Sequence, residues 1–200
     1  MTENAMTKDE LRKALRSVRR EHVAAQPDGI RALLFLRPPA AIMDLIFESA
    51  TIGLYRANPH EAPASHYARF FAERGHALAL PRFTARGSDM EFAAFTEPFG
   101  ESDLEPGPFG LLQPAADAPD MTPDVLFVPL VGFTPEGARL GQGGGHYDRW
   151  LEAHPTTLAI GLGWDVQAVD ELPVEAHDRS LDAVITPTRM YGPFAKETLH

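Results

Sequence analysis

Short apolar runs alternate with amphipathic segments along most of the chain. Runs rich in β-branched and aliphatic residues, bounded by glycine or proline, are typical of buried strands, whereas apolar residues spaced three and four apart are typical of helices. The expected strands are 51–55, 76–80 (stopped by Pro81), 90–96, 124–129 (stopped by Pro129), 157–163 and 181–186. The alternation favours an α/β fold: a three-layer, Rossmann-like open sheet, mostly parallel, with helices on both faces.

The first of these helices begins near the N-terminus. Thr7 has the character of an N-cap, and Glu10 stands at the capping-box position three residues later. Leu11, Ala14, Leu15, Val18 and His22 follow helical spacing and predict the packed face. The residues before this helix, Met1–Met6, are expected to form a loose tail.

The opposite face of this helix is strongly basic. It holds six of the chain's 18 Lys and Arg residues: Lys8, Arg12, Lys13, Arg16, Arg19 and Arg20. A solvated face, an anion-binding surface and a nucleic-acid arm are all compatible with this pattern. On the sequence alone, the outer arginines are expected at the surface.

Four further segments complete the predicted organisation of the chain. The apolar run 30–36 fits either a strand or a buried helix, and periodicity does not decide between them. Helices are expected at 40–49 and at 65–74, where Gly75 ends the second. The stretch 97–123, rich in proline and glycine, is the longest irregular segment, and long ordered loops often serve as functional lids.

Composition narrows the class of protein. Two hundred residues fit one domain, 1–200, and the chain has no cysteine, which excludes disulfides, thiolate metal sites and a cysteine nucleophile. No run of eighteen apolar residues and no signal-like N-terminus is present, so we expect a cytoplasmic protein without a membrane partner. The formal net charge of −10 argues against a nucleic-acid partner. A monomer is expected.

The most informative stretch is 140–151, where four glycines occupy five positions, 141–145, ahead of His-Tyr-Asp-Arg-Trp-Leu. Glycine lets backbone amides approach a ligand closely. A glycine loop that runs into a helix N-terminus directs unpaired N–H groups and the positive end of the helix dipole at one place. This arrangement is typical of a phosphate site.

The common phosphate motifs do not fit this loop. No Lys-Ser/Thr pair follows it, as a Walker A loop requires, and the spacing Gly141-x-Gly143-x-Gly145 lacks the last glycine of a dinucleotide fingerprint. A flexible surface loop with an ordinary helix cap remains the alternative reading of the glycines alone.

The segment 129–151 as a whole closely resembles the signature of the 5-formyltetrahydrofolate cyclo-ligase family, also called methenyltetrahydrofolate synthetase. The shared residues are Pro129, Gly132, Phe133, Gly137, Arg139, Leu140, Gly141, Gly143, Gly145, Tyr147, Asp148 and Leu151. His146 departs from the pattern, since the family usually has a tyrosine there that is thought to line the folate pocket. Lys8-x-x-Leu11-Arg12 matches an N-terminal element of the same family.

The resemblance implies a nucleotide site. In the family, the counterparts of Lys8 and Arg12 reach the ATP phosphates, and the glycine signature supplies further phosphate and magnesium contacts. The ATP-binding residues carried over are Lys8, Arg12, Arg139, Gly141, Gln142, Gly143, Gly144, Gly145, His146 and Tyr147. Asp148 is the expected Mg²⁺ ligand, with helix-dipole balancing as its alternative role. Lys8, Arg139 and Asp148 are the expected catalytic residues.

The folate side follows from the same resemblance. The family has a glutamate shortly after the first strand that contacts the formyl-bearing part of the substrate, and Glu61 occupies that place. Met90, Phe109, His146 and Tyr147 are the other expected substrate contacts, with core or loop-anchoring roles as alternatives for Met90 and Phe109. Arg82 fits either a folate carboxylate or phosphate or an ion pair with a nearby acid.

The activity implied is that of a ligase forming a C–N bond: ATP-dependent cyclisation of 5-formyltetrahydrofolate to 5,10-methenyltetrahydrofolate through a phosphorylated formyl group, with Mg²⁺ as cofactor. Phosphoryl transfer depends mainly on positioning and charge neutralisation, which suits glycine amides and cations. The alternatives are a non-catalytic nucleotide- or folate-binding module on the same scaffold and a sugar-phosphate isomerase-like enzyme.

Overall fold

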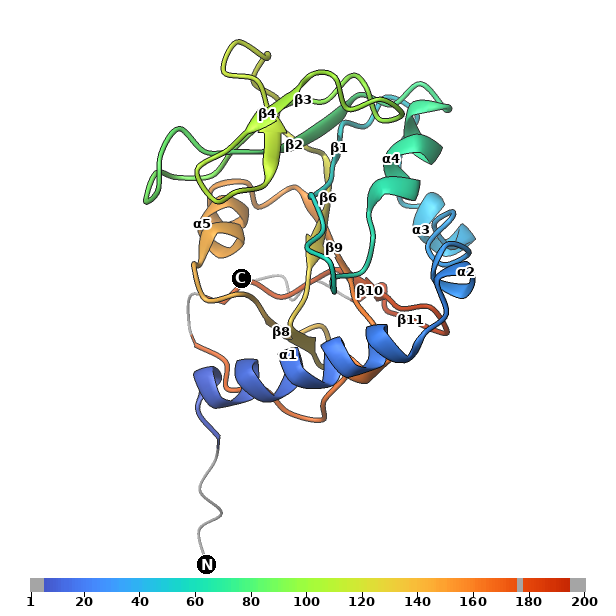
Figure 1. Ribbon diagram of the computed structural model, residues 1–200, viewed down its shortest axis with the longest axis vertical. Helices are drawn as coiled ribbons and strands as arrows, with labels where there is room; N and C mark the ends of the chain where they lie inside the picture. Colours follow the sequence, from blue (N-terminus) through green and yellow to red (C-terminus); the bar gives the residue numbers. More distant parts are fainter. Residues whose placement is uncertain (1–5, 176–177, 195–200) are drawn as a thin grey trace, which may run out of the picture.

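The computed structural model describes residues 6–175 and 178–194, and these form a mixed α/β fold (Figure 1). The expected tail, apart from Met6, lies outside the described residues. Five α-helices are present in the described part: α1 Lys8–Ala25, α2 Asp28–Arg31, α3 Ala40–Met43, α4 Ser65–Ala72 and α5 His146–Ala153. A single 3₁₀ turn, η1, spans Asp165–Gln167.

A seven-stranded, mostly parallel sheet forms the centre, in the order β11-β10-β9-β6-β1-β2-β3. Its strands are β1 Ile52–Gly53, β2 Leu78–Arg82, β3 Glu91–Ala94, β6 Val125–Pro129, β9 Leu158–Leu162, β10 Ala183–Ile185 and β11 Met190–Tyr191. The five inner strands are parallel, and the edge strands β3 and β11 pair antiparallel with their neighbours. The α/β class and the mostly parallel sheet are confirmed, whereas the finer Rossmann-like description stays a prediction.

Alternating residues of the strands pack on opposite faces of the sheet. Phe127 of β6 and Ile160 of β9 belong to one buried cluster, together with Tyr67 and Phe71 of α4. Their sequence neighbours face the other way and join Trp150 and Leu151 of α5 in a second cluster; these neighbours are Leu126, Val128 and Ala159. Strands buried on both faces explain why the sequence shows continuous apolar runs there.

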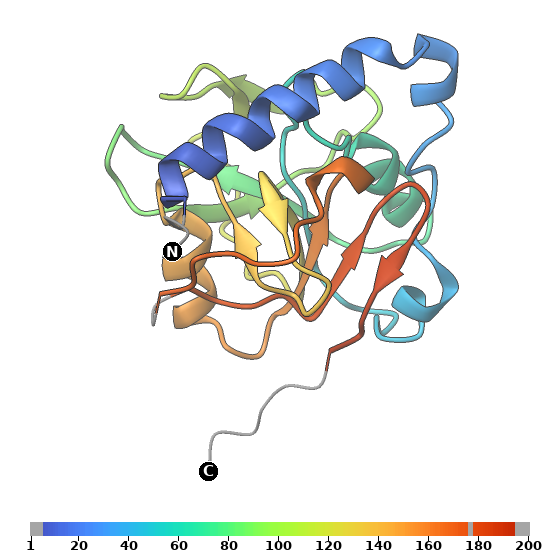
Figure 2. The ribbon, with the colours of Figure 1, turned by 90° about the horizontal axis from the view of Figure 1, so that it is seen from below.

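Helix α1 lies across one end of the sheet, as Figures 1 and 2 show from two directions. Its capping box forms as the sequence predicts: the Thr7 hydroxyl accepts from the Glu10 N–H, and the Glu10 carboxylate accepts from the Thr7 N–H at 2.9 Å. Leu15 packs against the chain at Gly132, where an added Cβ would lie 2.5 Å from the Leu15 side chain. The side chains on the inner face of α1 are therefore closely fixed.

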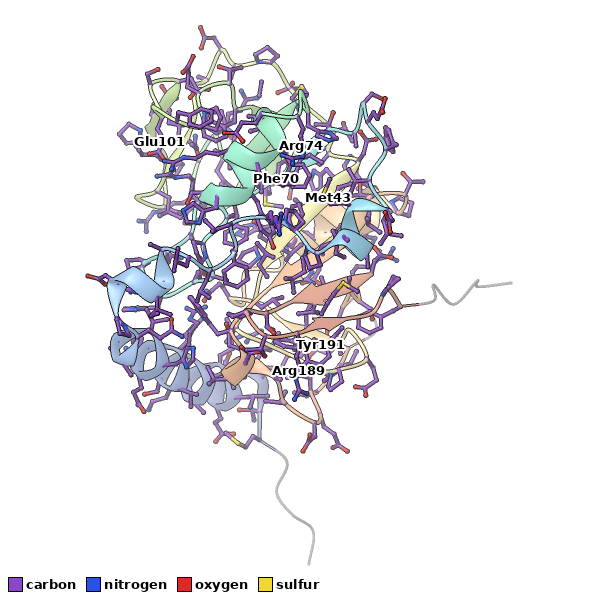
Figure 3. The ribbon with its side chains drawn as sticks, turned by 90° about the vertical axis from the view of Figure 1, so that its right-hand side faces the viewer. Met43, Phe70, Arg74, Glu101, Arg189 and Tyr191 are labelled. Atoms are coloured by element: carbon purple, nitrogen blue, oxygen red, sulfur yellow. The ribbon has the colours of Figure 1, made fainter. Side chains whose placement is uncertain are left out.

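Helix α4 packs on the face of the sheet opposite to α5, and Figure 3 shows the side of the molecule on which it lies. Tyr67, Ala68 and Phe71 form its buried face. Phe70 lies at its outer edge, where the Arg74 guanidinium stacks over the ring with Cζ 3.6 Å from the centroid. The aliphatic and guanidinium groups of a long side chain thus shield an aromatic ring at the surface.

Several sequence predictions need correction in their extent. The strand expected at 51–55 is reduced to β1, and the helix expected at 40–49 is reduced to the single turn α3 followed by turns. The ambiguous run 30–36 is neither a strand nor a buried helix: α2 ends at Arg31, turns follow, and Leu33 is 66% exposed. The irregular stretch 97–123 contains a hairpin of β4 Leu104–Pro106 and β5 Leu112–Pro114.

Strand β2 runs through the proline that was expected to stop it. Pro81 pairs with Phe92 of β3 on one side. On the other side β1 reaches only Ala79, so no neighbouring strand requires an N–H from residue 81. Proline is tolerated where a strand is locally an edge, and this strand is an edge at that point.

The packing of α4 predicts a large cost for removing Phe71. This side chain is fully buried and makes edge or tilted ring contacts with Tyr67, His76 and Phe127. Phe71→Ala should lower the free energy of unfolding by about 3–5 kcal/mol, measured by urea denaturation. Phe47→Ala is the matched control: Phe47 is 56% exposed, and its loss should change stability by roughly 0.5 kcal/mol or less. Equal costs for the two variants would contradict this packing.

Candidate active site

A cavity of about 870 Å³ opens at the edge of the sheet where the central strands end. Tyr55 follows β1, Pro81 and Phe83 lie at the end of β2, and Pro129 ends β6; all four line the cavity. In sequence order the chain passes from β1 to β2 on one side, and β6 later pairs on the other side of β1. This reversal of strand order is the place where open α/β sheets form ligand crevices.

Apart from Arg82, every candidate site residue from the sequence lines this one cavity. They belong to α1, to the loop after β1, to the region from β2 to β5 and to the glycine segment. The residues are Lys8, Arg12, Glu61, Met90, Phe109, Arg139, Gly141, Gln142, Gly143, Gly144, Gly145, His146, Tyr147 and Asp148.

The glycine loop adopts backbone angles that favour glycine. Gly143 has φ 105° and Gly145 has φ 64°, both in the left-handed region. Gly145 is the N-cap of α5 and provides no side-chain hydrogen bond to the first turn. The amides that begin α5 therefore face the cavity end of the helix without a side-chain acceptor, which suits an anionic ligand.

Two cations of α1 lie beside this loop. Arg12 Nε donates to the carbonyl of Gly141 at 3.0 Å, and its guanidinium Cζ lies 3.4 Å from the position of a Cβ built on Gly143. Lys8 Nζ lies 2.7 Å from Asp178 Oδ2 and 3.1 Å from Glu175 Oε2. Burial lowers the pKa of Lys8, but hydrogen bonds and charge from these two carboxylates outweigh that effect and raise its pKa above the ordinary value. Lys8 is therefore a charged group in the cavity wall.

Arg139 and Asp148 form a buried ion pair across the start of α5. Arg139 NH2 lies 2.6 Å from Asp148 Oδ1, and the Arg139 side chain is only 3% exposed. Burial lowers the pKa of Arg139, and the charge of Asp148 opposes that shift. Asp148 Oδ1 also accepts from the N–H of Arg179 at 3.2 Å. Asp148 Oδ2 has no hydrogen-bond partner within the described part of the chain.

Glu61 is buried, with 7% of its surface exposed. Its Oε2 accepts from the Asn58 N–H at 2.8 Å, and its Oε1 accepts from Gln142 Nε2, also at 2.8 Å. The loop that carries it is pinned nearby, where Trp164 Nε1 donates to the His60 carbonyl at 3.0 Å. Glu61 is thus held at the wall of the cavity by Asn58 of its own loop and by Gln142 of the glycine loop.

His146 forms an aromatic wall with Phe83 and Phe109. Its ring centroid lies 5.0 Å from that of Phe83 and 6.0 Å from that of Phe109. Arg149 NH2 lies 3.1 Å from His146 Nδ1, and because arginine only donates, the neutral ring carries its proton on Nε2. Burial first, and then the charge of Arg149, lower the pKa of His146, while Asp89 opposes the shift. A flat ligand can stack on such a wall.

Tyr147 and Met90 complete the apolar side of the cavity. Met90 is 6% exposed, whereas Phe109 is 46% exposed at the rim. Burial raises the pKa of the Tyr147 hydroxyl well above its ordinary value, and Glu61 adds to the shift. Tyr147 therefore stays protonated at neutral pH.

The surface position expected for the outer arginines of α1 is confirmed for Arg20, which is exposed, but is wrong for Arg19. Arg19 is 6% exposed, donates from NH1 to the carbonyl of Leu130 at 3.0 Å and lies 3.9 Å from Glu61 Oε1. Arg16 donates to the Gln142 carbonyl and to Gln142 Oε1. The predicted packed face was shifted accordingly, since Val18 is 42% exposed. Helical spacing is compatible with a solvated basic face and with one that packs against the fold. Only the contacts of Arg16 and Arg19 distinguish these two arrangements.

Arg82 takes the second of its two expected roles. It pairs with Asp120 and donates to the carbonyls of Ala115, Ala116 and Ala118, away from the cavity lining. Asp178 also lines the cavity, together with Glu175. The neighbouring His177 lies outside the described residues.

The donor set suits a magnesium ion bound jointly with a ligand. In the described ranges no group of three or more His, Cys, Asp or Glu side chains is placed to hold a metal ion. Mg²⁺ is commonly held by one or two carboxylates together with substrate phosphates and water. Asp148, whose Oδ2 is not used in a hydrogen bond to a described residue, fits that pattern.

The sequence profile of the 5-formyltetrahydrofolate cyclo-ligase family matches residues 4–187 of this chain. The chain belongs to this family. The 5-formyltetrahydrofolate cyclo-ligase of Escherichia coli (strain K12) is 41% identical over 97 residues, which cover 46% of this chain and 53% of the relative. The match to such relatives therefore spans about half their length. The mouse 5-formyltetrahydrofolate cyclo-ligase is 23% identical over 198 residues, covering 90% of this chain and 96% of the relative.

The fold agrees with this membership. The NMR structure of Aquifex aeolicus 5,10-methenyltetrahydrofolate synthetase superposes with a TM-score of 0.74 at 25% identity, over 98% of this chain and 97% of that one. In the described residues, no helix has the length and apolarity needed to cross a membrane.

The surroundings of His146 predict its titration. Its pKa should lie below the ordinary value of about 6.5 in an NMR pH titration of the ring protons. Arg149→Ala should raise this pKa by removing a nearby positive charge, and Asp89→Ala should lower it further. Because the unfolded chain binds this proton more readily, His146 should reduce stability as the pH falls below about 6.5. A pKa at or above 6.5 in the wild type would contradict the described packing.

Proposed function

We propose that this chain is a 5-formyltetrahydrofolate cyclo-ligase, which uses ATP to convert 5-formyltetrahydrofolate into 5,10-methenyltetrahydrofolate, ADP and phosphate. The supporting observation is the gathering of the candidate residues, apart from Arg82, on one cavity at the carboxyl edge of the sheet. That cavity combines an anion-binding loop with an aromatic and apolar wall, as a reaction between a polyphosphate and a flat heterocycle requires.

The phosphate end of the site is built from α1 and the glycine segment. The amides at the start of α5, together with Lys8 and Arg12, would hold the ATP phosphates. The buried Arg139 adds a fixed positive charge at the same end. Because such groups are already oriented, they can stabilise charge that develops during phosphoryl transfer without rearrangement.

The folate end is built from Glu61 and the aromatic wall. We infer that the heterocycle stacks on His146 and Phe109, with Met90 and Tyr147 below it. The buried carboxylate of Glu61 would accept hydrogen bonds from N–H groups of the heterocycle and so fix its orientation. A buried polar anchor beside an apolar wall gives both affinity and specificity.

The chemistry follows from bringing the two ends together. The formyl oxygen attacks the γ-phosphorus, the bond to the β-phosphate oxygen breaks, and ADP leaves. The second amine of the folate then attacks the activated formyl carbon and loses its proton. The C–O bond to the phosphoryl group breaks, phosphate departs, and the ring closes. No protein nucleophile is needed, so positioning and charge are the main contributions of the chain.

Asp148 is the residue that would hold Mg²⁺. When bound there with the phosphates, the ion would neutralise charge on the transferring group. The ion pair with Arg139 restricts the orientation of the Asp148 carboxylate. The chain would act as a single domain and a monomer, without nucleic acid.

The activity test is direct. Protein, 5-formyltetrahydrofolate and Mg-ATP should give the methenyl product, followed by its absorbance, with an equimolar release of ADP. Omitting ATP, or removing divalent ions with a chelator, should abolish product formation. Stoichiometric binding of nucleotide and folate with no product in the complete mixture would overturn the proposed activity.

Lys8 should contribute mainly to nucleotide affinity. Lys8→Ala removes a charged hydrogen-bond donor to phosphate and should raise the apparent KM for ATP roughly tenfold or more. Lys13→Ala is the matched control, because Lys13 is an exposed lysine of the same helix and does not line the cavity. The KM for ATP of each variant and of the wild type is obtained from initial rates over a range of ATP concentrations. An unchanged KM in the Lys8 variant would return this residue to a structural role.

A further inference from the structure

One side chain of the glycine loop 141–145, that of Gln142, links this loop to Glu61 at the folate end of the site. Within the loop 141–145 only Gln142 has a side chain, since the other four residues are glycines. That side chain reaches Glu61 on one side and Arg16 of α1 on the other. We propose that Gln142, positioned by Arg16, couples the two subsites so that nucleotide and folate bind cooperatively. This inference rests on the proposed function.

The orientation of the Gln142 amide is determined at both ends. Its Nε2 donates to Glu61 Oε1 at 2.8 Å, and its Oε1 accepts from Arg16 NH2 at 2.7 Å and from Arg16 Nε at 3.1 Å. Arginine only donates and a carboxylate only accepts, so the reversed amide would lose these bonds. The same Arg16 NH2 also donates to the Gln142 backbone carbonyl at 3.0 Å. Backbone and side chain of residue 142 therefore move together with α1.

The connection matters because Glu61 is buried. A buried carboxylate depends on its donors, and Gln142 supplies the donor on Oε1, while the Arg19 guanidinium lies 3.9 Å from the same oxygen. If the glycine loop shifts when phosphates bind, Gln142 must shift with it. The position of the Glu61 carboxylate then changes as well, and with it the affinity for the folate.

The flanking glycines make such a shift possible. Gly143 has φ 105°, and a Cβ added at Gly141 would meet only the Arg139 guanidinium within 4 Å, at 3.5 Å. The nearest groups to a Cβ at position 141 or 143 are the guanidinium groups of Arg139, at 3.5 Å, and Arg12, at 3.4 Å, so the glycine backbone packs against flexible side chains, while the Gln142 side chain is firmly bonded. Residue 142 lies between matching glycines of the family signature, at one of the positions that are not part of the shared pattern.

Coupling is measured by calorimetry. The affinity for 5-formyltetrahydrofolate is determined alone and in the presence of saturating magnesium and a non-hydrolysable ATP analogue. The wild type should bind the folate more tightly with the nucleotide present, within the usual range of roughly 5- to 150-fold. Gln142→Met keeps the side-chain length and removes the hydrogen bonds. It should bring this ratio close to one; the ratio is the readout, because loss of the Gln142 hydrogen bonds also lowers the affinity for each ligand alone.

Arg16 and a neighbouring arginine provide the comparison. Arg16→Ala should reduce the ratio like Gln142→Met, and the double variant should lose no more than either single variant, because both act through one path. Arg20→Ala is the control, since Arg20 is exposed on the same helix and does not line the cavity. It should keep the wild-type ratio.

The possible results separate the inference from the activity. A wild-type ratio near one, or wild-type coupling in Gln142→Met, would overturn the coupling and leave the proposed function standing. An equal loss of affinity for both ligands in Arg16→Ala, with the ratio preserved, would also overturn it, because that is the mark of a merely structural role. Failure of the wild type to bind either ligand would overturn both proposals.

Discussion

The contact of the basic face of α1 with the glycine segment is the constraint on which the site depends. Lys8, Arg12, Arg16 and Arg19 follow one another at helical spacing and point to the same side of the helix. Arg12 contacts Gly141, Arg16 contacts Gln142, and Arg19 contacts the chain after β6. A chain with a formal net charge of −10 thus concentrates positive charge where a polyphosphate would lie.

This contact needs a rigid helix and an adaptable loop. The capping box and the burial of Leu15 and Val23 fix α1 against the end of the sheet. The loop gains its shape from glycines at left-handed positions, and α5 begins directly after it. The buried pair of Arg139 and Asp148 then ties the start of α5 to the preceding hairpin of β7 Gly132–Phe133 and β8 Arg139–Leu140. The residues of the proposed anion site are therefore held by contacts within the chain.

The sequence predicted those features whose cause is local. The capping box depends on Thr7 and Glu10, three residues apart, and the glycine loop precedes its own helix, so both could be inferred directly. The extents of β1 and β2 depended on how far their neighbours run, which local patterns do not encode. The hairpin of β4 and β5 lay in a stretch rich in proline and glycine that has no clear alternation.

The side chains missed by sequence analysis have distant partners. Arg19 appeared to be one more surface arginine, yet its neighbours are Leu130 and Glu61. The link from Gln142 to Glu61 likewise joins segments far apart in the chain. Helical spacing identifies the residues that share a face of α1, but the fold determines which of those faces meets the site.

A crystal structure with 5-formyltetrahydrofolate and a non-hydrolysable ATP analogue would show where the two ligands bind. Both are expected in the cavity at the carboxyl edge, with the phosphates between α1 and residues 141–145 and the folate against His146 and Glu61. Phosphates bound elsewhere, for example in the adjoining cavity of about 630 Å³ beside α2 and α4, would contradict this arrangement.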